Sequence, residues 1–210
     1  MLGVPVGLVL GREAWVRLRG GAIPIRPPFT DSRLLATLGL EIVLAILLGA
    51  WLRRRNWSPR TEIGRPVPFD MVRGGVLWIV TFAVVRLVNV ALGAVASGDL
   101  ASAKQGTLTG DLSLPVMAAA LIINPLFEET LWLAYAVPTL SRRLGVLAAA
   151  ALSIGLRVGV HGNQGLLAVT SVLPVAVVWT AYYIRSGRLW PVVVAHVINN
   201  AIGFSTFMRG

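Results

Sequence analysis

The chain has 210 residues, of which 56% are hydrophobic and 13% charged, and its mean hydropathy is +0.75. This balance excludes an ordinary soluble globular domain and predicts an integral membrane protein. The formal net charge of +10 arises from 19 basic residues against 9 acidic ones. Because most of the arginines flank apolar stretches or lie in short loops, we attribute the excess to membrane topology and lipid head groups, and we expect no nucleic acid partner.

Six apolar stretches account for nearly the whole chain, and each approaches the about 20 residues that cross the hydrocarbon. They are Leu34 to Leu52, Met71 to Val95, Leu114 to Leu140, Leu144 to Val160, Leu166 to Ile184 and Leu189 to Met208. The fold class predicted from them is all-α, a polytopic helical membrane protein with about six transmembrane helices. We expect an interfacial segment over 1–33 and one membrane domain over 34–210. The absence of a basic region before "MLGVPVGLVL" and of a cleavage site after it argues against a signal peptide.

Polar residues inside these stretches are the first candidates for function, because a charge at the bilayer centre costs on the order of 3 kcal/mol. The ionisable ones are Glu41, Arg86, Glu128, Glu129, Arg157, His161 and His196, and the amides are Asn89, Asn124, Asn199 and Asn200. A spacing of four residues on a helix brings side chains to one face. It predicts three shared faces: Asn124 with Glu128, Arg157 with His161, and His196 with Asn200.

Depth in the membrane supports a common site. Counting about 1.5 Å per residue from the basic helix ends places Glu128, His161 and Asn200 at comparable levels. Glu128 and Glu129 are adjacent, and in a low dielectric both cannot ionise cheaply unless a cation or donor stands beside them. A carboxylate poised in this way can take a proton from water near neutral pH. Cysteine is absent, which excludes a thiol nucleophile.

Structural alternatives exist for each of these residues. A histidine in a membrane helix often makes only an interhelical hydrogen bond, and Glu41 with Arg86 could form a buried ion pair. Asn124 precedes Pro125 and could bond a backbone carbonyl freed by the proline. We interpret the aromatic residues as packing and interface groups without chemistry: Trp132, Tyr135, Trp179, Tyr182 and Tyr183.

Three segments resemble the motifs of a known family. "FEETLWLAYAVPTL" is similar to the first, "GVHGNQG" to the second and "GRLWPVVVAHVINNAIGF" to the third motif of the CPBP family, the intramembrane glutamic-type peptidases that include CAAX prenyl endopeptidases and bacteriocin-immunity proteins. The resemblance runs from Asn124 to Gly203, within a CPBP-like core at 114–208. The third motif is the most specific, because its G-x-LWP entry, its His and Asn and their spacing all agree.

The resemblance implies roles for individual residues. Glu128 and His161 would activate a water molecule, and Glu129 would orient a partner. His196 and Asn200 would form the oxyanion pair. Apart from the resemblance, we expect Arg157 and Asn124 to support the site. This assignment agrees with general chemistry, in which a carboxylate base acts beside imidazole while neutral donors face the developing charge.

Two positions depart from the family pattern E-E-x-x-x-R and F-x-x-x-H. Leu133 stands at the position of the first motif's Arg, with Ala134 where Gly is usual, and Arg157 stands at the position of the second motif's Phe. We hypothesise that Arg157 supplies, from the fourth stretch, the positive charge that Leu133 lacks. Its guanidinium would pair with Glu129 and reduce the cost of burying both acids.

The leading functional hypothesis is an intramembrane endopeptidase acting on a peptide or membrane-protein substrate, possibly prenylated, in a bacterial plasma membrane. The alternative is a non-catalytic membrane scaffold or bacteriocin-immunity protein on the same fold. A transporter or proton path through Glu41, Arg86, Glu128 and His161 is disfavoured, because no inverted repeat is present. We expect no required cofactor; zinc is possible by donor type, but no H-E-x-x-H motif is present.

Overall fold

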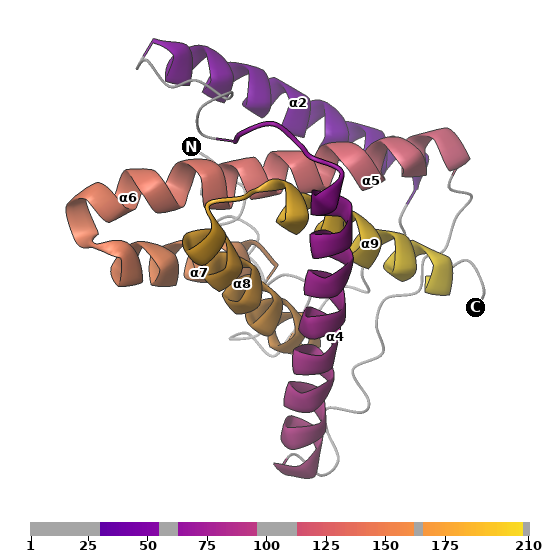
Figure 1. The fold of residues 1–210 in the computed structure, drawn as a ribbon. Coiled ribbons are helices and arrows are strands. Elements are labelled where there is room, and N and C mark those ends of the chain that lie inside the picture. The colour runs from indigo at the N-terminus through magenta and orange to yellow at the C-terminus, as the bar shows by residue number, and fades with distance from the viewer. Residues whose placement is uncertain (1–29, 55–62, 96–112, 162–165, 208–210) are drawn as a thin grey trace, which may run out of the picture.

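Nearly all of the part of the chain that the computed structural model describes, residues 30–54, 63–95, 113–161 and 166–207, is helical (Figure 1). Within these ranges there are six continuous helical segments and no strand. They are α2 (Asp31–Arg53), α4 (Phe69–Val95), the run of α5 (Leu114–Glu129), η1 (Thr130–Ala136) and α6 (Val137–Leu144), α7 (Val146–His161), α8 (Leu166–Ser186) and α9 (Trp190–Phe207). Each predicted apolar stretch coincides with one segment, which confirms the all-α prediction. Most of the predicted interfacial segment 1–33 lies outside the described residues.

Three of the described helical segments are long and apolar enough to cross a membrane: Leu34–Arg53, Phe69–Gly93 and Leu114–Leu144. A shorter apolar helix covers Val146–His161. These lengths and compositions are those of an integral membrane protein. The count of six spans stays a prediction.

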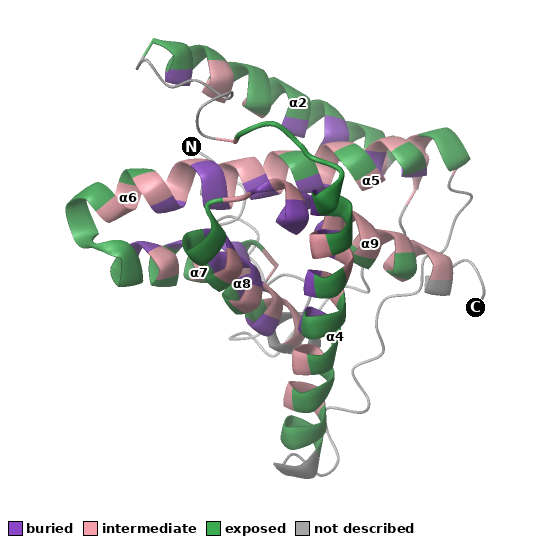
Figure 2. Ribbon diagram, viewed as in Figure 1, coloured by how far each residue is buried: buried purple, intermediate pink, exposed green. Residues whose placement is uncertain are grey.

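Packing joins consecutive helices as well as helices that are distant in the sequence. Helix α2 lies along α5, α6 packs against α7, and α4 packs against both α8 and α9 (Figure 1). The main core cluster includes Leu77 of α4, Leu133 of η1, Trp179 of α8 and Val192 of α9. Exposed residues cover much of α2 and much of the C-terminal half of α4 (Figure 2). Many of these are large aliphatic side chains, as expected of surfaces that face lipid.

A close approach of α4 to α9 depends on Gly74. A Cβ atom at this position would lie 2.5 Å from Cβ of Val194 and 2.9 Å from the carbonyl oxygen of Pro191. Only glycine permits this distance without a shift of the backbone, because real Cβ atoms do not approach other atoms so closely. The first turns of α9 are therefore held firmly against α4, and this fixes the position of the third-motif helix.

The helical run from α5 to α6 is irregular where the first motif lies. Pro125 lies inside α5 and removes one backbone donor. The π-helix η1 starts directly after Glu129. The hydroxyl of Ser153 on α7 donates to the carbonyl oxygen of Trp132 in η1 at 2.8 Å. Segments of π-helix often occur at functional sites, and the sequence did not predict this one.

Asp70 and Arg188 join the start of α4 to the turn between α8 and α9. We call this contact the Asp70–Arg188 clamp. Nε of Arg188 donates to Oδ1 of Asp70 at 2.8 Å, Nη2 donates to Oδ2 at 2.7 Å, and the backbone N–H of Val67 donates to Oδ2 at 3.0 Å. Hydrogen bonding to the Asp70 carboxylate raises the pKa of the Arg188 guanidinium above its ordinary value, so the clamp remains charged.

Candidate active site

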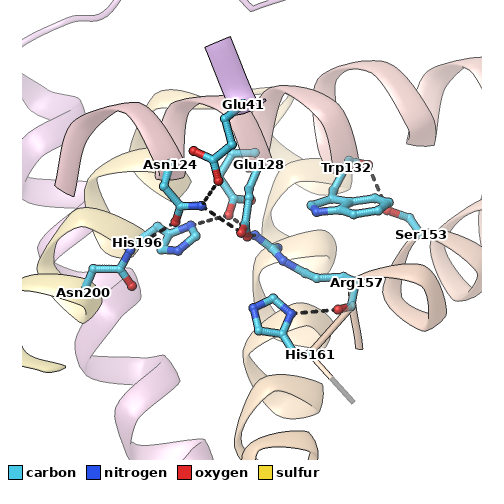
Figure 3. Close-up of polar contacts among 10 residues, drawn as sticks. Glu41, Asn124, Glu128, Trp132, Ser153, Arg157, His161, His196 and Asn200 are labelled. Carbon is cyan, nitrogen blue, oxygen red and sulfur yellow. Dashed lines mark hydrogen bonds and ion pairs between the residues drawn. The ribbon is translucent and has the colours of Figure 1, made fainter. Parts of the chain in front are cut away.

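Side chains from four helices meet at one place in the described structure (Figure 3). We call this set the polar centre: Glu41 of α2, Asn124, Glu128 and Glu129 of α5, Arg157 of α7, and His196 and Asn200 of α9. Predicted site residues from three separate apolar stretches are therefore neighbours in space.

Glu129 is the most enclosed member of the polar centre, with a side chain that is 0% exposed. Its Oε1 accepts a hydrogen bond from Nη2 of Arg157 and lies 2.7 Å from Nδ1 of His196. The predicted pairing of Arg157 with Glu129 is thus confirmed as a contact. Because Arg157 is itself buried, each charge is stabilised chiefly by the other rather than by solvent.

Glu128 is in a different environment from its neighbour. Its side chain is 18% exposed. Oε1 accepts a hydrogen bond from Nδ2 of Asn124 at 3.0 Å, and Oε2 lies 3.9 Å from Nη2 of Arg157. Of the two adjacent acids, Glu128 is therefore the one that a water molecule or substrate can approach.

Asn124 connects three helices through its amide group. Its Nδ2 donates to Oε1 of Glu41 at 2.7 Å as well as to Glu128, and its Oδ1 accepts a hydrogen bond from Nδ2 of Asn200 at 3.5 Å. The interpretation that Asn124 bonds a freed carbonyl is therefore wrong. The Glu41–Arg86 ion pair is also wrong, because Glu41 bonds Asn124 while Arg86 is exposed on α4.

His161 lies at the end of α7 beside Arg157. Its Nδ1 is 2.9 Å from the backbone carbonyl oxygen of Arg157, so Nδ1 must carry the proton and the lone pair of the neutral ring is on Nε2. Among the contacts described for this part of the chain, none joins His161 to Glu128. Their shared role in activating water stays a prediction, and Gly162–Gly165 of the second motif lies outside the described residues.

Trp179 forms a wall of the polar centre, which its interpretation as a packing residue missed. It is buried in the core, as predicted, but its ring also lies 5.1 Å from the ring of His196, and the guanidinium carbon of Arg157 lies 5.3 Å from its centre. Its Nε1 donates to Oγ1 of Thr81 at 3.0 Å. An aromatic face beside a guanidinium stabilises the positive charge. A tryptophan in an apolar stretch does not indicate which charged side chains its ring contacts, so the sequence could not predict this contact.

A metal ion is conceivable by donor type. Glu128, Glu129 and His196 each offer a ligand atom, and these atoms lie within 4.8 Å of one another. However, the guanidinium of Arg157 already contacts Oε1 of Glu129. A divalent cation bound to these ligand atoms would have to displace the guanidinium of Arg157 from Glu129. The two positive charges would then repel each other at short range. The residues present therefore fit a metal poorly.

The fold and the polar centre together define a class, the polytopic helical membrane proteins with a buried acid, imidazole and guanidinium centre. Within it, residues 110–202 match the family model described as Rce1-like, the type II CAAX prenyl endopeptidase Rce1-like family. This match confirms the CPBP resemblance and supports a CAAX protease-like membrane function in general. No curated protein and no solved structure matches the chain. Helices α2 and α4, and with them Glu41, lie outside the matched residues.

Proposed function

We propose that the protein is an intramembrane endopeptidase of the CAAX protease type, which hydrolyses a peptide bond with water activated at Glu128. The different environments of the two adjacent acids carry this proposal. Glu129 is enclosed and bonded to Arg157 and His196, whereas Glu128 is partly accessible. One acid thus orients the site and the other is available for reaction.

In the proposed reaction Glu128 accepts a proton from water as the water oxygen attacks the substrate carbonyl carbon. Nε2 of His161 assists in holding that water. The C–N bond then breaks, the proton passes to the leaving amine, and the products are a carboxylic acid and an amine. The step needs no oxidant, and we propose that it needs no metal.

His196 and Asn200 are proposed to stabilise the oxyanion. With Nδ1 of His196 directed at the Glu129 carboxylate, the ring is held in a fixed orientation and Nε2 faces away from Glu129. Asn200 provides an amide N–H from the same face of α9.

The substrate is proposed to be a prenylated peptide or a membrane protein, because the matched family is that of a CAAX prenyl endopeptidase. We further propose the bacterial plasma membrane as the location. The alternative function, a non-catalytic scaffold or immunity protein, is favoured by one observation. Leu133, at the position of the family's motif arginine, is fully buried in the core, so the first motif is altered at its centre.

Replacing Glu128 by Gln separates the two functions. Gln keeps the size and can still accept a hydrogen bond from Asn124, but it cannot take the proton. We expect cleavage of a farnesylated CAAX peptide in proteoliposomes to fall about 100- to 10,000-fold, with the thermal unfolding temperature unchanged. The control is Asn199→Ala, an exposed neighbour of Asn200 on α9, which should keep wild-type turnover. Equal cleavage by wild type and Glu128→Gln would disprove the proposed reaction.

A further inference from the structure

Glu41 brings a third carboxyl group to the polar centre from a helix outside the matched family segment. It lies near the middle of α2 and is 8% exposed. Burying an ionisable group at this depth is costly. A Ser or Gln side chain could hold α2 against α5 by a hydrogen bond at lower cost, because neither side chain is ionised. Packing alone therefore does not account for a carboxyl group here.

The hydrogen bond described for Glu41 joins its carboxyl group to the side-chain amide of Asn124. Its Oε1 accepts from Nδ2 of Asn124 at 2.7 Å, and the same nitrogen donates to Oε1 of Glu128 at 3.0 Å. The two carboxylates thus share the two N–H bonds of one side chain. An amide nitrogen has no further donor to offer, so both directions of Asn124 Nδ2 are used.

The second carboxyl oxygen of Glu41 is in a different environment from the first. Oε2 is buried and has no hydrogen-bond partner within the described part of the chain. Glu41 also borders a groove of about 410 Å³ between α2 and α5, whose other lining residues are almost all apolar, among them Ile46, Leu126 and Phe127. No donor from this lining reaches the free oxygen in the described structure, so its desolvation is not offset. Buried polar groups left in this state call for a functional explanation.

We propose that Glu41 is a positioning residue for the reaction: it fixes the amide orientation of Asn124 and, through it, the carboxylate of Glu128. The catalytic part of this inference rests on the proposed function. With Glu41 present, the amide nitrogen faces the two acids and the amide oxygen faces Asn200. Without Glu41 the amide keeps only its hydrogen bond to Glu128 and the 3.5 Å contact to Asn200. It can then rotate about its Cβ–Cγ bond, and the carboxylate of Glu128 would shift with it.

Three substitutions at position 41 test this inference. Glu41→Leu removes the acceptor, Glu41→Asp keeps the charge but withdraws it by one methylene, and Glu41→Gln keeps an acceptor at the right distance. We expect Leu and Asp to lower kcat for the farnesylated CAAX peptide about 10- to 100-fold, the size of effect that small misplacements produce, with KM changed less than about threefold. Gln should keep kcat within about threefold of wild type.

The matched control is Leu38→Ala. Leu38 is buried on α2, three residues before Glu41, and makes no part of the polar centre. Its truncation should lower the unfolding temperature without changing kcat. If Glu41→Leu does not fold, the Asp and Gln variants carry the comparison. Wild-type kcat in Glu41→Asp, or an equal loss in Asp and Gln, would overturn the inference.

A second measurement does not depend on turnover. The side-chain amide signals of Asn124 can be followed by NMR in detergent micelles after labelling with ¹⁵N-asparagine, and they are assigned by their loss in Asn124→Gln. We expect Glu41→Asp to shift these signals and to speed exchange of their protons with solvent, whereas Glu41→Gln should leave them near their wild-type positions. Unchanged signals in Glu41→Asp would contradict the positioning role. If wild type does not cleave the peptide but these signals move as expected, the proposed function fails while the orientation of Asn124 by Glu41 holds.

Discussion

The polar centre and the Asp70–Arg188 clamp each join a buried acid to an arginine from a distant part of the chain, but they use their hydrogen-bonding capacity differently. In the clamp both oxygens of Asp70 are bonded, to Nε and Nη2 of Arg188 and to the N–H of Val67. In the polar centre, buried atoms are left without a described partner: Oε2 of Glu41, Oε2 of Glu129 and Nη1 of Arg157.

We interpret this difference as that between a structural ion pair and an ion pair that serves the proposed reaction. A structural pair is most stable when every donor and acceptor is used within the protein. A site that acts on a substrate must keep some groups for the substrate and therefore carries unsatisfied atoms in its free state. The clamp secures the α8–α9 turn on α4, while the polar centre keeps its capacity for a reacting group.

The largest effect is expected from breaking the polar centre at Arg157. Arg157→Ala leaves the fully buried Glu129 without its counter-charge, which typically costs about 3–5 kcal/mol of folding free energy. We expect a strong fall in the unfolding temperature measured in detergent, or loss of folded protein, together with loss of peptide cleavage.

The double variant Arg157→Ala/Glu129→Gln sharpens this prediction. Removing the orphaned charge should restore part of the unfolding temperature, because a neutral amide is less costly to bury than an unpaired carboxylate. If the double variant is destabilised by the sum of the two single changes, the two side chains do not act as a pair.

A smaller effect is expected from breaking the clamp with Asp70→Asn. The amide cannot balance the charge of Arg188, and we expect a loss of about 2 kcal/mol, seen as a lower unfolding temperature. Turnover of the folded fraction should remain within about twofold of wild type, because the clamp touches no reacting group. Arg73→Gln, at the more exposed arginine 3.7 Å from Asp70, is the control and should change neither quantity much. A large fall in kcat for folded Asp70→Asn would erase the distinction between the two regions.

No effect is expected from removing metal ions. Arg157 provides the positive charge in the position that a cation bound to Glu129 would take. Cleavage of the peptide should therefore persist after exhaustive chelation and dialysis. Loss of activity on chelation, with recovery on adding zinc, would show that Glu128, Glu129 and His196 hold a metal ion.

Part of the polar centre was predictable from local spacing alone. The pair Asn124 with Glu128 follows from the helical period and is a side-chain contact in the structure. For Arg157 and His161 the contact joins the His161 ring to the backbone carbonyl oxygen of Arg157. The hypothesis that Arg157 supplies the positive charge missing at Leu133 identified the correct partner for Glu129. The bond between Glu41 and Asn124 could not be predicted in this way, because it joins residues 83 positions apart and depends on how α2 lies on α5.

The amino-acid sequence by itself determined the fold class and the placement of the helices, because a bilayer offers no partners for free backbone groups and long apolar stretches must therefore become helices. The motifs also indicated the family. Only the tertiary structure decided which of two adjacent acids is enclosed. Neighbouring residues on a helix point in different directions. The packing of α7 against η1 and of α9 against α5 directs Arg157 and His196 to Glu129 and leaves Glu128 partly open.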